Sequence, residues 1–205
     1  MAITDYTDLQ TTVATYLGRT DLNDIIPTFI DFAESRLSRE LRTRKMLKNV
    51  TSPITANTDK LALPNDFLSL RDIFVQGNPR QRLTYMSPSA FSSDARPDQS
   101  GKPLYYTIYS AEFVMAPIPD AAYTLELLYY ARPNRLDEDT VSNVFLANYP
   151  DALLYASLIE AEPYLMNDAR LPTWISMYEK AIATINKDDD ESEYSAVPLA
   201  IKNVR

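Results

Sequence analysis

Helical periodicity occupies both ends of this chain, and a long stretch without it lies between them. Apolar residues recur at the spacing of one helix face within 9–17, 26–41, 154–165 and 174–185. From about Leu47 to Pro133 the pattern changes to short runs punctuated by proline, which is typical of strands and tight turns. Because each apolar stripe must be buried, we expect the terminal helices to pack on each other and the β-rich segment to be an insertion.

Local signals place the first helices. Thr7 and Gln10 have the spacing of a capping box, so we expect a helix from about Asp8 to Leu17 that Gly18 ends in a left-handed conformation. Pro27 suits the first turn of the second helix, where its missing N–H costs no hydrogen bond.

The middle segment carries three strand signals and one helix signal. TLELLYYA alternates, so Leu125, Leu127 and Tyr129 share one face of a strand. YYTIY and EFVMA predict one hairpin, and RDIFVQ and RLTYM predict a second hairpin around GNP. In SPSAF, Ser87 as a cap and Pro88 at the first position predict a short helix.

These signals predict an α+β fold: a helical-bundle lobe, an inserted and mostly antiparallel β region, and an extended C-terminal arm. The expected boundaries are 1–46 and 146–186 for the helical lobe, 47–133 for the β-rich insertion, 134–145 for an acidic connector, and 187–205 for a flexible arm.

The composition removes most enzyme chemistries. The chain has no cysteine and no histidine, which excludes thiolate nucleophiles, Ser-His-Asp arrangements and most zinc sites. Its three glycines, Gly18, Gly77 and Gly101, lie too far apart to form a phosphate-binding loop. Carboxylates are plentiful, but no pair has the spacing of a catalytic site. We therefore expect no enzymatic activity, no cofactor and no metal.

One segment is strongly basic, although the chain as a whole is acidic. Residues 36–48, RLSRELRTRKMLK, contain six of the 20 Lys and Arg residues, in a chain of net charge −8. On a helical projection Arg36, Arg39 and Arg42 lie opposite the apolar stripe, and the basic run continues into Arg44 and Lys45. The sequence leaves three roles open for these residues: a subunit or portal contact, a solvated face with internal pairs such as Glu40 with Arg36 or Arg44, and a DNA contact.

The last residues form another separate segment. An acidic run, DDDESE, precedes SAVPLAI, which is apolar but too short to fold alone. A short apolar segment on a charged tether is typical of a docking arm that orders on a partner.

Four phrases, in this order, resemble the head-to-tail adaptor proteins of short-tailed and related bacteriophages. They are DLNDIIPTFIDFAESRLSRELR, LPNDFLSLRDIFVQG, AYTLELLYYARP and NYPDALLYASLIEAEPYLMNDARLPTWISMYEKAIATIN, and together they cover most of the chain. None contains a catalytic or ligand-binding signature, so their order and spacing carry the resemblance.

The resemblance implies a structural virion protein at the head–tail junction. Such adaptors form a ring, commonly of twelve copies, below the portal protein; they extend the DNA channel and hold the tail or nozzle proteins. DNA would pass through without sequence-specific binding. The C-terminal arm of such adaptors reaches the portal, and by position the residues in that role are Ser195, Val197, Pro198, Leu199 and Ile201.

Two alternative functions stay open at this point. A nucleic-acid-binding protein would explain the basic segment, although a pI near 4.6 opposes phosphate binding. A tail-associated cell-wall hydrolase would use two carboxylates. No apolar run is long enough to span a membrane and the N-terminus lacks a signal-peptide pattern, so we expect the protein to stay in the host cytoplasm until it joins the virion.

Overall fold

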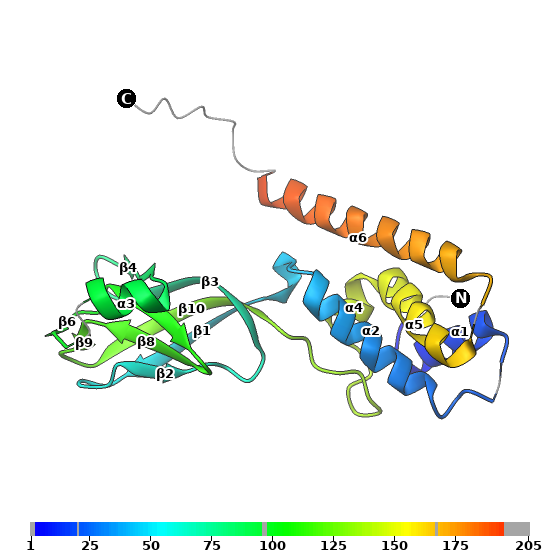
Figure 1. The fold of residues 1–205 in the computed structure, drawn as a ribbon, viewed down its shortest axis with the longest axis horizontal. Coiled ribbons are helices and arrows are strands. Elements are labelled where there is room, and N and C mark those ends of the chain that lie inside the picture. The colour runs from blue at the N-terminus through cyan, green and yellow to red at the C-terminus, as the bar shows by residue number, and fades with distance from the viewer. Residues whose placement is uncertain (1–2, 20, 96–97, 167, 195–205) are drawn as a thin grey trace. The chain divides into compact units, whose positions relative to one another are not determined.

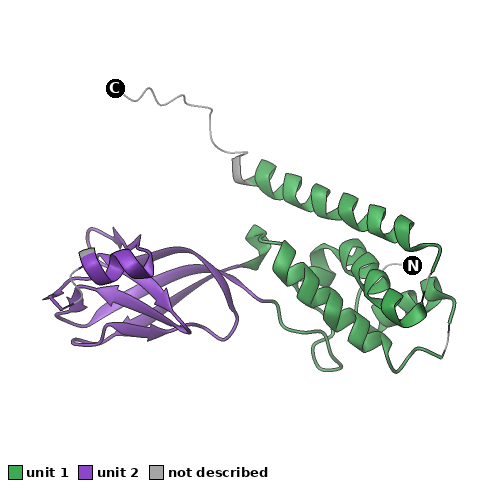
Figure 2. Cartoon of the chain, viewed as in Figure 1, with its two compact units in different colours: residues 1–46, 133–205 green, residues 47–132 purple. Residues whose placement is uncertain are grey.

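The computed structural model of the chain has an α+β fold, which confirms the predicted class (Figure 1). It describes residues 3–19, 21–95, 98–166 and 168–194. Two compact units share the chain (Figure 2): residues 1–46 and 133–205 form the helical unit, and residues 47–132 form the β unit. The stretch 134–145, expected to be a connector, falls within the helical unit.

Helix α5 is the central element of the helical unit, because α1, α2 and α6 all pack against it. The helical segments among the described residues of this unit are α1 (Tyr6–Leu17), α2 (Ile26–Glu40), the 3-10 turn η1 (Arg44–Met46), α4 (Val144–Asn148), α5 (Pro150–Leu165) and α6 (Leu171–Tyr194). None of these helices is long and apolar enough to cross a lipid bilayer.

The apolar stripes predicted from the sequence form the core of this unit. Their buried members are Ile26, Ile30, Ala33, Leu37 and Leu41 in or next to α2, Leu154, Leu158 and Ala161 on α5, and Trp174, Tyr178, Ala181 and Ile185 on α6. Met177 was expected in the stripe of α6 but is 44% exposed. It precedes Tyr178 by one residue and therefore lies about 100° away around the helix.

The first helix begins earlier than the capping-box spacing predicted. Asp5 is the N-cap, with an extended backbone, and its Oδ1 accepts a hydrogen bond from the N–H of Asp8 at 2.8 Å. Thr7 therefore lies inside the first turn, and Thr7 and Gln10 do not form the predicted capping box. The other end follows the prediction, since Gly18 ends the helix at φ 69°.

Helix α6 extends further than the sequence predicted. The expected arm began at Lys187, but the helix continues through the acidic run to Tyr194. The reason is a set of contacts that offset the repulsion among these acidic side chains. Asp189 binds Arg44, and Lys187 lies 3.6 Å from Glu191 one turn later.

The described residues of the β unit form two four-stranded sheets, a two-stranded ribbon and one short helix. The first sheet has the order β1 (Leu47–Ile54), β10 (Tyr123–Ala131), β3 (Phe67–Val75), β4 (Gln81–Arg82). The second has the order β2 (Lys60–Ala62), β8 (Glu112–Ala116), β7 (Tyr105–Tyr109), β5 (Thr84–Tyr85). The ribbon pairs β6 (Ser100–Gly101) with β9 (Ile118–Pro119), and the helix is α3 (Pro88–Asp94).

Most of the predicted β structure is confirmed. Strands β7 and β8 form the expected antiparallel hairpin, and Ser87 caps α3 with Pro88 in its first turn. The second hairpin is shorter than predicted, because β3 and β4 pair at only two positions. The chain then changes sheets at buried Leu83, and Thr84 and Tyr85 pair in parallel with β7.

The core of the β unit lies between the two sheets. Leu125, Leu127 and Tyr129 are buried there, as the alternation of TLELLYYA predicted. They pack with Phe113 and Met115 of the second sheet. The aromatic rings of Phe67 and Phe113 meet edge to face with centroids 5.6 Å apart. This unit therefore has an apolar core of its own.

Candidate interaction site

Arg36, the first residue of the basic segment, is half-buried in contacts with other helices of the helical unit. Its Nε donates to Oε1 of Glu160 on α5 at 2.6 Å, and its Nη2 lies 2.5 Å from the same oxygen. Its guanidinium carbon is 5.9 Å from the centre of the Tyr178 ring on α6. Arg36 thus joins three helices, and the prediction that it faces away from the core is wrong.

Glu40 also has a different partner from those expected. Its Oε2 accepts a hydrogen bond from the hydroxyl of Tyr178 at 2.6 Å, whereas the sequence suggested Arg36 or Arg44 as its partner. Burial raises the pKa of Tyr178 well above its usual value, and the hydrogen bond to the Glu40 carboxylate raises it further. The phenol therefore stays protonated and remains a donor at physiological pH.

Arg42 completes the C-terminal end of α2. Its Nη1 donates to the carbonyl oxygens of Ser38 and Leu41, both at 2.6 Å. The last carbonyls of a helix have no partner within the helix, and a guanidinium near them also interacts favourably with the helix dipole. Arg42 therefore acts as a local cap in this structure.

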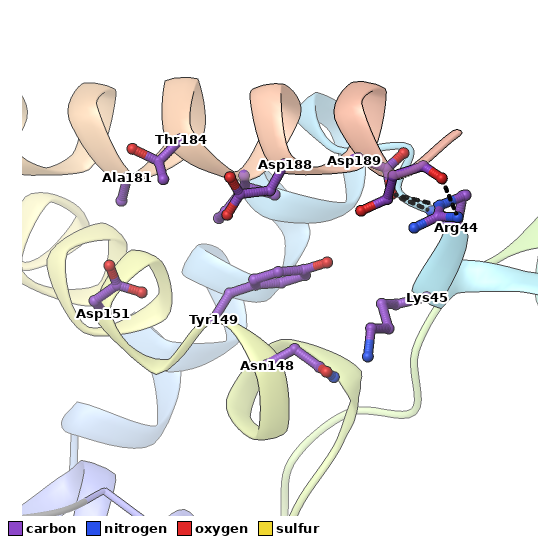
Figure 3. A pocket seen from close by; sticks show the side chains of 11 residues that line it. Arg44, Lys45, Asn148, Tyr149, Asp151, Ala181, Thr184, Asp188 and Asp189 are labelled. Atoms are coloured by element: carbon purple, nitrogen blue, oxygen red, sulfur yellow. Dashed lines mark hydrogen bonds and ion pairs between the residues drawn. The ribbon is translucent and has the colours of Figure 1, made fainter. Parts of the chain in front are cut away.

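Arg44 holds the far end of α6 (Figure 3). Its backbone N–H donates to Oδ1 of Asp189 at 2.9 Å, and its Nη1 donates to the carbonyl oxygen of Ser192 at 3.0 Å. Its Nε lies 3.6 Å from the same Asp189 oxygen. Three contacts from one residue thus connect η1 with the last turns of α6.

A pocket of about 590 Å³ opens beside this contact (Figure 3). The lining comes from η1, from the α4–α5 junction and from α6. Its members are Arg44, Lys45, Asn148, Tyr149, Asp151, Ala181, Thr184, Ile185, Asp188, Asp189 and Ser192. With both cations and carboxylates in its wall, the pocket suits polar side chains of a partner. No group of three or more acidic side chains in the described ranges is arranged to hold a metal ion.

Arg39 and Lys45 complete the basic set. Both side chains are exposed, unlike those of Arg36 and Arg42, which are half-buried. Of the five predicted basic residues, Arg36, Arg42 and Arg44 are therefore held by contacts within the unit, although Arg44 is itself 43% exposed. Arg39 and Lys45 are the other two exposed members of the set. The predicted arm residues, Ser195, Val197, Pro198, Leu199 and Ile201, lie outside the residues that the structure describes.

Sequence reasoning missed Glu34, a buried carboxylate on α2. It accepts hydrogen bonds from the Leu136 N–H at 3.2 Å and from the side-chain amide of Asn143. Burial raises the pKa of Glu34 to about 7, with a smaller raising effect from Asp31; these two hydrogen bonds and Arg135 oppose the shift. The signal was present in the sequence, because Glu34 follows Ile30 by four residues and so shares its buried stripe.

Comparison with known families supplies the identity that these contacts leave open. The model of the SU10 adaptor protein family matches residues 4–202, which include residues of both units. A comparison with curated proteins gives no match. The chain therefore belongs to the SU10 adaptor protein family, a family of bacteriophage head–tail adaptors, and is a structural adaptor protein.

Proposed function

We propose that copies of the protein form a ring between the portal protein and the tail or nozzle proteins of a bacteriophage. Twelve copies, the common number in adaptors of this kind, is the proposed size of the ring. The ring extends the DNA channel and provides the platform to which the tail attaches. The observation that carries this proposal is the family match, because it runs through both units and is not confined to one of them.

Charge separation within the helical unit supports head-to-tail contact between neighbouring subunits. Arg39 and Lys45 are exposed at one end of α2 and in η1, and Asp188, Asp190 and Glu191 are exposed on α6. A ring uses two different surfaces of each subunit, so complementary charges on those surfaces fix register and partner choice. We propose Arg39 and Lys45 as the contact residues of the basic segment.

Exposed apolar side chains of the helical unit offer further contact area. Phe32 on α2 is 53% exposed, Tyr164 near the end of α5 is 52% exposed, and Met166 directly after α5 is 84% exposed. Subunit interfaces are enriched in aromatic residues and methionine. These three side chains are suited to burial against a neighbouring subunit or the portal.

The proposed role is structural and not catalytic, with assembly in the host cytoplasm and a final place at the portal vertex. Genomic DNA passes through the ring without sequence-specific binding. An acidic chain suits this task, since each phosphate neutralised by a cation adds affinity that would slow the passage of DNA.

Charge reversal tests the proposed contact residues. The portal protein is mixed with wild-type protein or with the Arg39→Glu/Lys45→Glu variant, and bound protein is measured by sedimentation. We expect the variant to lose binding or ring closure. The control, Lys60→Glu/Lys180→Glu, makes the same total charge change at two other exposed basic residues and should assemble normally. Equal assembly of both variants would remove Arg39 and Lys45 from the interface. Failure of the wild type to bind the portal would contradict the proposed function itself.

A further inference from the structure

Residues 134–143, here called the strap, carry the chain from the β unit towards α4 and form no helix or strand. Leu136, which is 3% exposed, is the one buried side chain of the strap, and most of the others are exposed. A segment with so little buried apolar surface opens easily unless polar contacts hold it. The attachment of the strap therefore depends on its hydrogen bonds and ion pairs.

Glu34 on α2 binds the strap through both of its carboxylate oxygens. Its Oε2 accepts a hydrogen bond from the N–H of Leu136 at 3.2 Å, and its Oε1 accepts from the side-chain amide of Asn143. The Asn143 amide also donates to the carbonyl oxygen of Asn134 at 2.7 Å, and its Oδ1 caps α4. One carboxylate thus holds the strap near both of its ends.

Two further contacts attach the strap to the helices. Nη2 of Arg135 lies 2.7 Å from Oδ2 of Asp31 on α2, but the Arg135 side chain is 66% exposed, and exposed ion pairs contribute little. The carbonyl oxygen of Val141 accepts a hydrogen bond from the N–H of Tyr6 at 2.9 Å. Because Tyr6 is the first residue of α1, its N–H has no acceptor within that helix. This N–H therefore reports whether the strap is in place.

Glu34 changes its charge near neutral pH. It is 6% exposed, and burial raises its pKa to about 7. The charged and titratable groups that face it are Asp31 on α2, Arg135 on the strap and Tyr6 on α1. Asp31 and Arg135 carry opposite charges, and burial raises the pKa of Tyr6 above its usual value, so its hydroxyl stays neutral. Ionisation of Glu34 thus places a negative charge in a buried site, which is unfavourable.

We propose that Glu34 is a proton-controlled latch, whose neutral form holds the strap on α2 and whose ionised form lets the strap leave while the helical unit stays folded. The strap continues one of the two chain connections between the units. Its release lengthens that connection and so gives the β unit a wider range of positions. The latch is a property of the single subunit and does not depend on the proposed ring.

The direction of the pH effect follows from the two states of the strap. With the strap attached, the pKa of Glu34 is about 7; with the strap released, the carboxyl lies in water and returns to its ordinary value of 4.5. The raised pKa stabilises the attached strap fully below pH 4.5, and this stabilisation is lost as the pH rises to 7. Release should therefore increase up to about 300-fold over this window, which is the ratio of the two acid constants.

Amide hydrogen exchange in the full-length protein, followed residue by residue by NMR between pH 4.5 and about 8, tests the latch. The reporters are the N–H groups of Leu136 and Tyr6, which lose their acceptors when the strap leaves. We expect their protection factors to fall up to about 300-fold between pH 4.5 and 7 and then to level off. The N–H of Asp8, which donates to Asp5 in the same first turn of α1, is the control and should keep its protection.

Urea separates release of the strap from unfolding of the unit. A local opening exposes little surface, so low urea should leave exchange at Leu136 and Tyr6 unchanged while it speeds exchange at Leu154 and Leu158 in the core of α5. Exchange of all four amides at one rate, with one urea dependence, would mean that the strap leaves only when the unit unfolds. That result would overturn the latch.

Two variants identify the titrating group. Glu34→Gln cannot ionise, so protection of Leu136 and Tyr6 should then change less than about three-fold between pH 4.5 and 7. Glu138→Gln removes an exposed carboxyl from the strap itself and should keep the wild-type slope. A slope that persists in Glu34→Gln, or wild-type protection that rises with pH, would overturn the latch. If Glu34→Gln does not fold, the wild-type pH profile and its urea dependence decide between the same outcomes.

Discussion

Arg36 of α2 and Glu160 of α5 form a half-buried ion pair, in which both Nε and Nη2 of the arginine contact Oε1 of the carboxylate at 2.6 and 2.5 Å. The two residues are separated by the whole β unit in the sequence, so this pair joins the two halves of the helical unit. A basic side chain that the sequence predicted to face outward thus makes a structural contact between two helices of the helical unit.

Replacement of Arg36 should therefore destabilise the protein. We expect Arg36→Ala to lower the free energy of unfolding by about 2 kcal/mol, because it leaves Glu160 without its charge-assisted hydrogen bond. Arg39→Ala, on the exposed side of the same helix, is the control and should change it by less than about 0.5 kcal/mol. Urea unfolding measures both. Equal stability of the two variants would show that the ion pair contributes nothing to the fold.

The contact of Arg44 with Asp189 and Ser192 predicts a local effect at the end of α6. Without the guanidinium, we expect faster amide hydrogen exchange in residues 187–192, while exchange in Trp174–Ile185 stays unchanged, because helix ends fray when few contacts hold them. Arg44→Ala tests this, with Lys45→Ala as the control in the same turn. Unchanged exchange at 187–192 in Arg44→Ala would mean that α6 keeps its last turns by itself.

Glu34 predicts a dependence of stability on pH. Its pKa is about 7 in the folded protein, against 4.5 for an unperturbed glutamate, so between these values the folded state holds a proton that the unfolded state has released. The free energy of unfolding should therefore fall as pH rises from about 4.5 to 7, by up to about 3 kcal/mol. Carboxylates with a lowered pKa, such as Asp66, change the free energy of unfolding at pH values below this range.

Glu34→Gln identifies the group responsible for that slope. The glutamine does not titrate, so the variant should show an almost flat stability profile between pH 4.5 and 7 in urea unfolding experiments. One of the two donors, Leu136 N–H or the Asn143 amide, then faces an NH₂ group, which lowers stability at every pH by about 1–3 kcal/mol. A wild-type slope that persists in the variant would assign the titration to another residue.

The start of α1 gives a small but well-controlled test of the structure. Asp5→Ala removes the N-cap acceptor of the Asp8 N–H and should cost about 1 kcal/mol in thermal or urea unfolding. Thr7→Ala removes a residue that a capping box would require and that this structure places inside the first turn. Asp5→Ala should cause the larger loss of stability. A larger loss from Thr7→Ala would indicate that the predicted capping box does form.

Patterns with a short repeat predicted the elements well. The alternation of TLELLYYA determined which side of β10 is buried, and the helical stripes located the core of α2, α5 and α6. Such patterns work because the period of a helix or strand fixes which side chains share a face. The α+β class followed from the order of these elements along the chain.

The contacts between distant residues could not be predicted in the same way. Arg44 and Asp189 meet only because α5 and α6 return the chain to η1, and nothing in the acidic run indicates which of its carboxylates finds a cation. Side chains with long flexible stems choose their partners after the helices pack. This explains why the basic segment could be recognised from its charge, while the division between internal and exposed residues required the structure.

The ring between portal and tail is tested most directly by electron microscopy of the wild-type protein mixed with its portal protein. Two-dimensional class averages should show a closed ring of adaptor subunits at one end of the portal, around a continuous central channel. Class averages that show the portal alone, or adaptor subunits that attach without closing a ring, would contradict the proposed function.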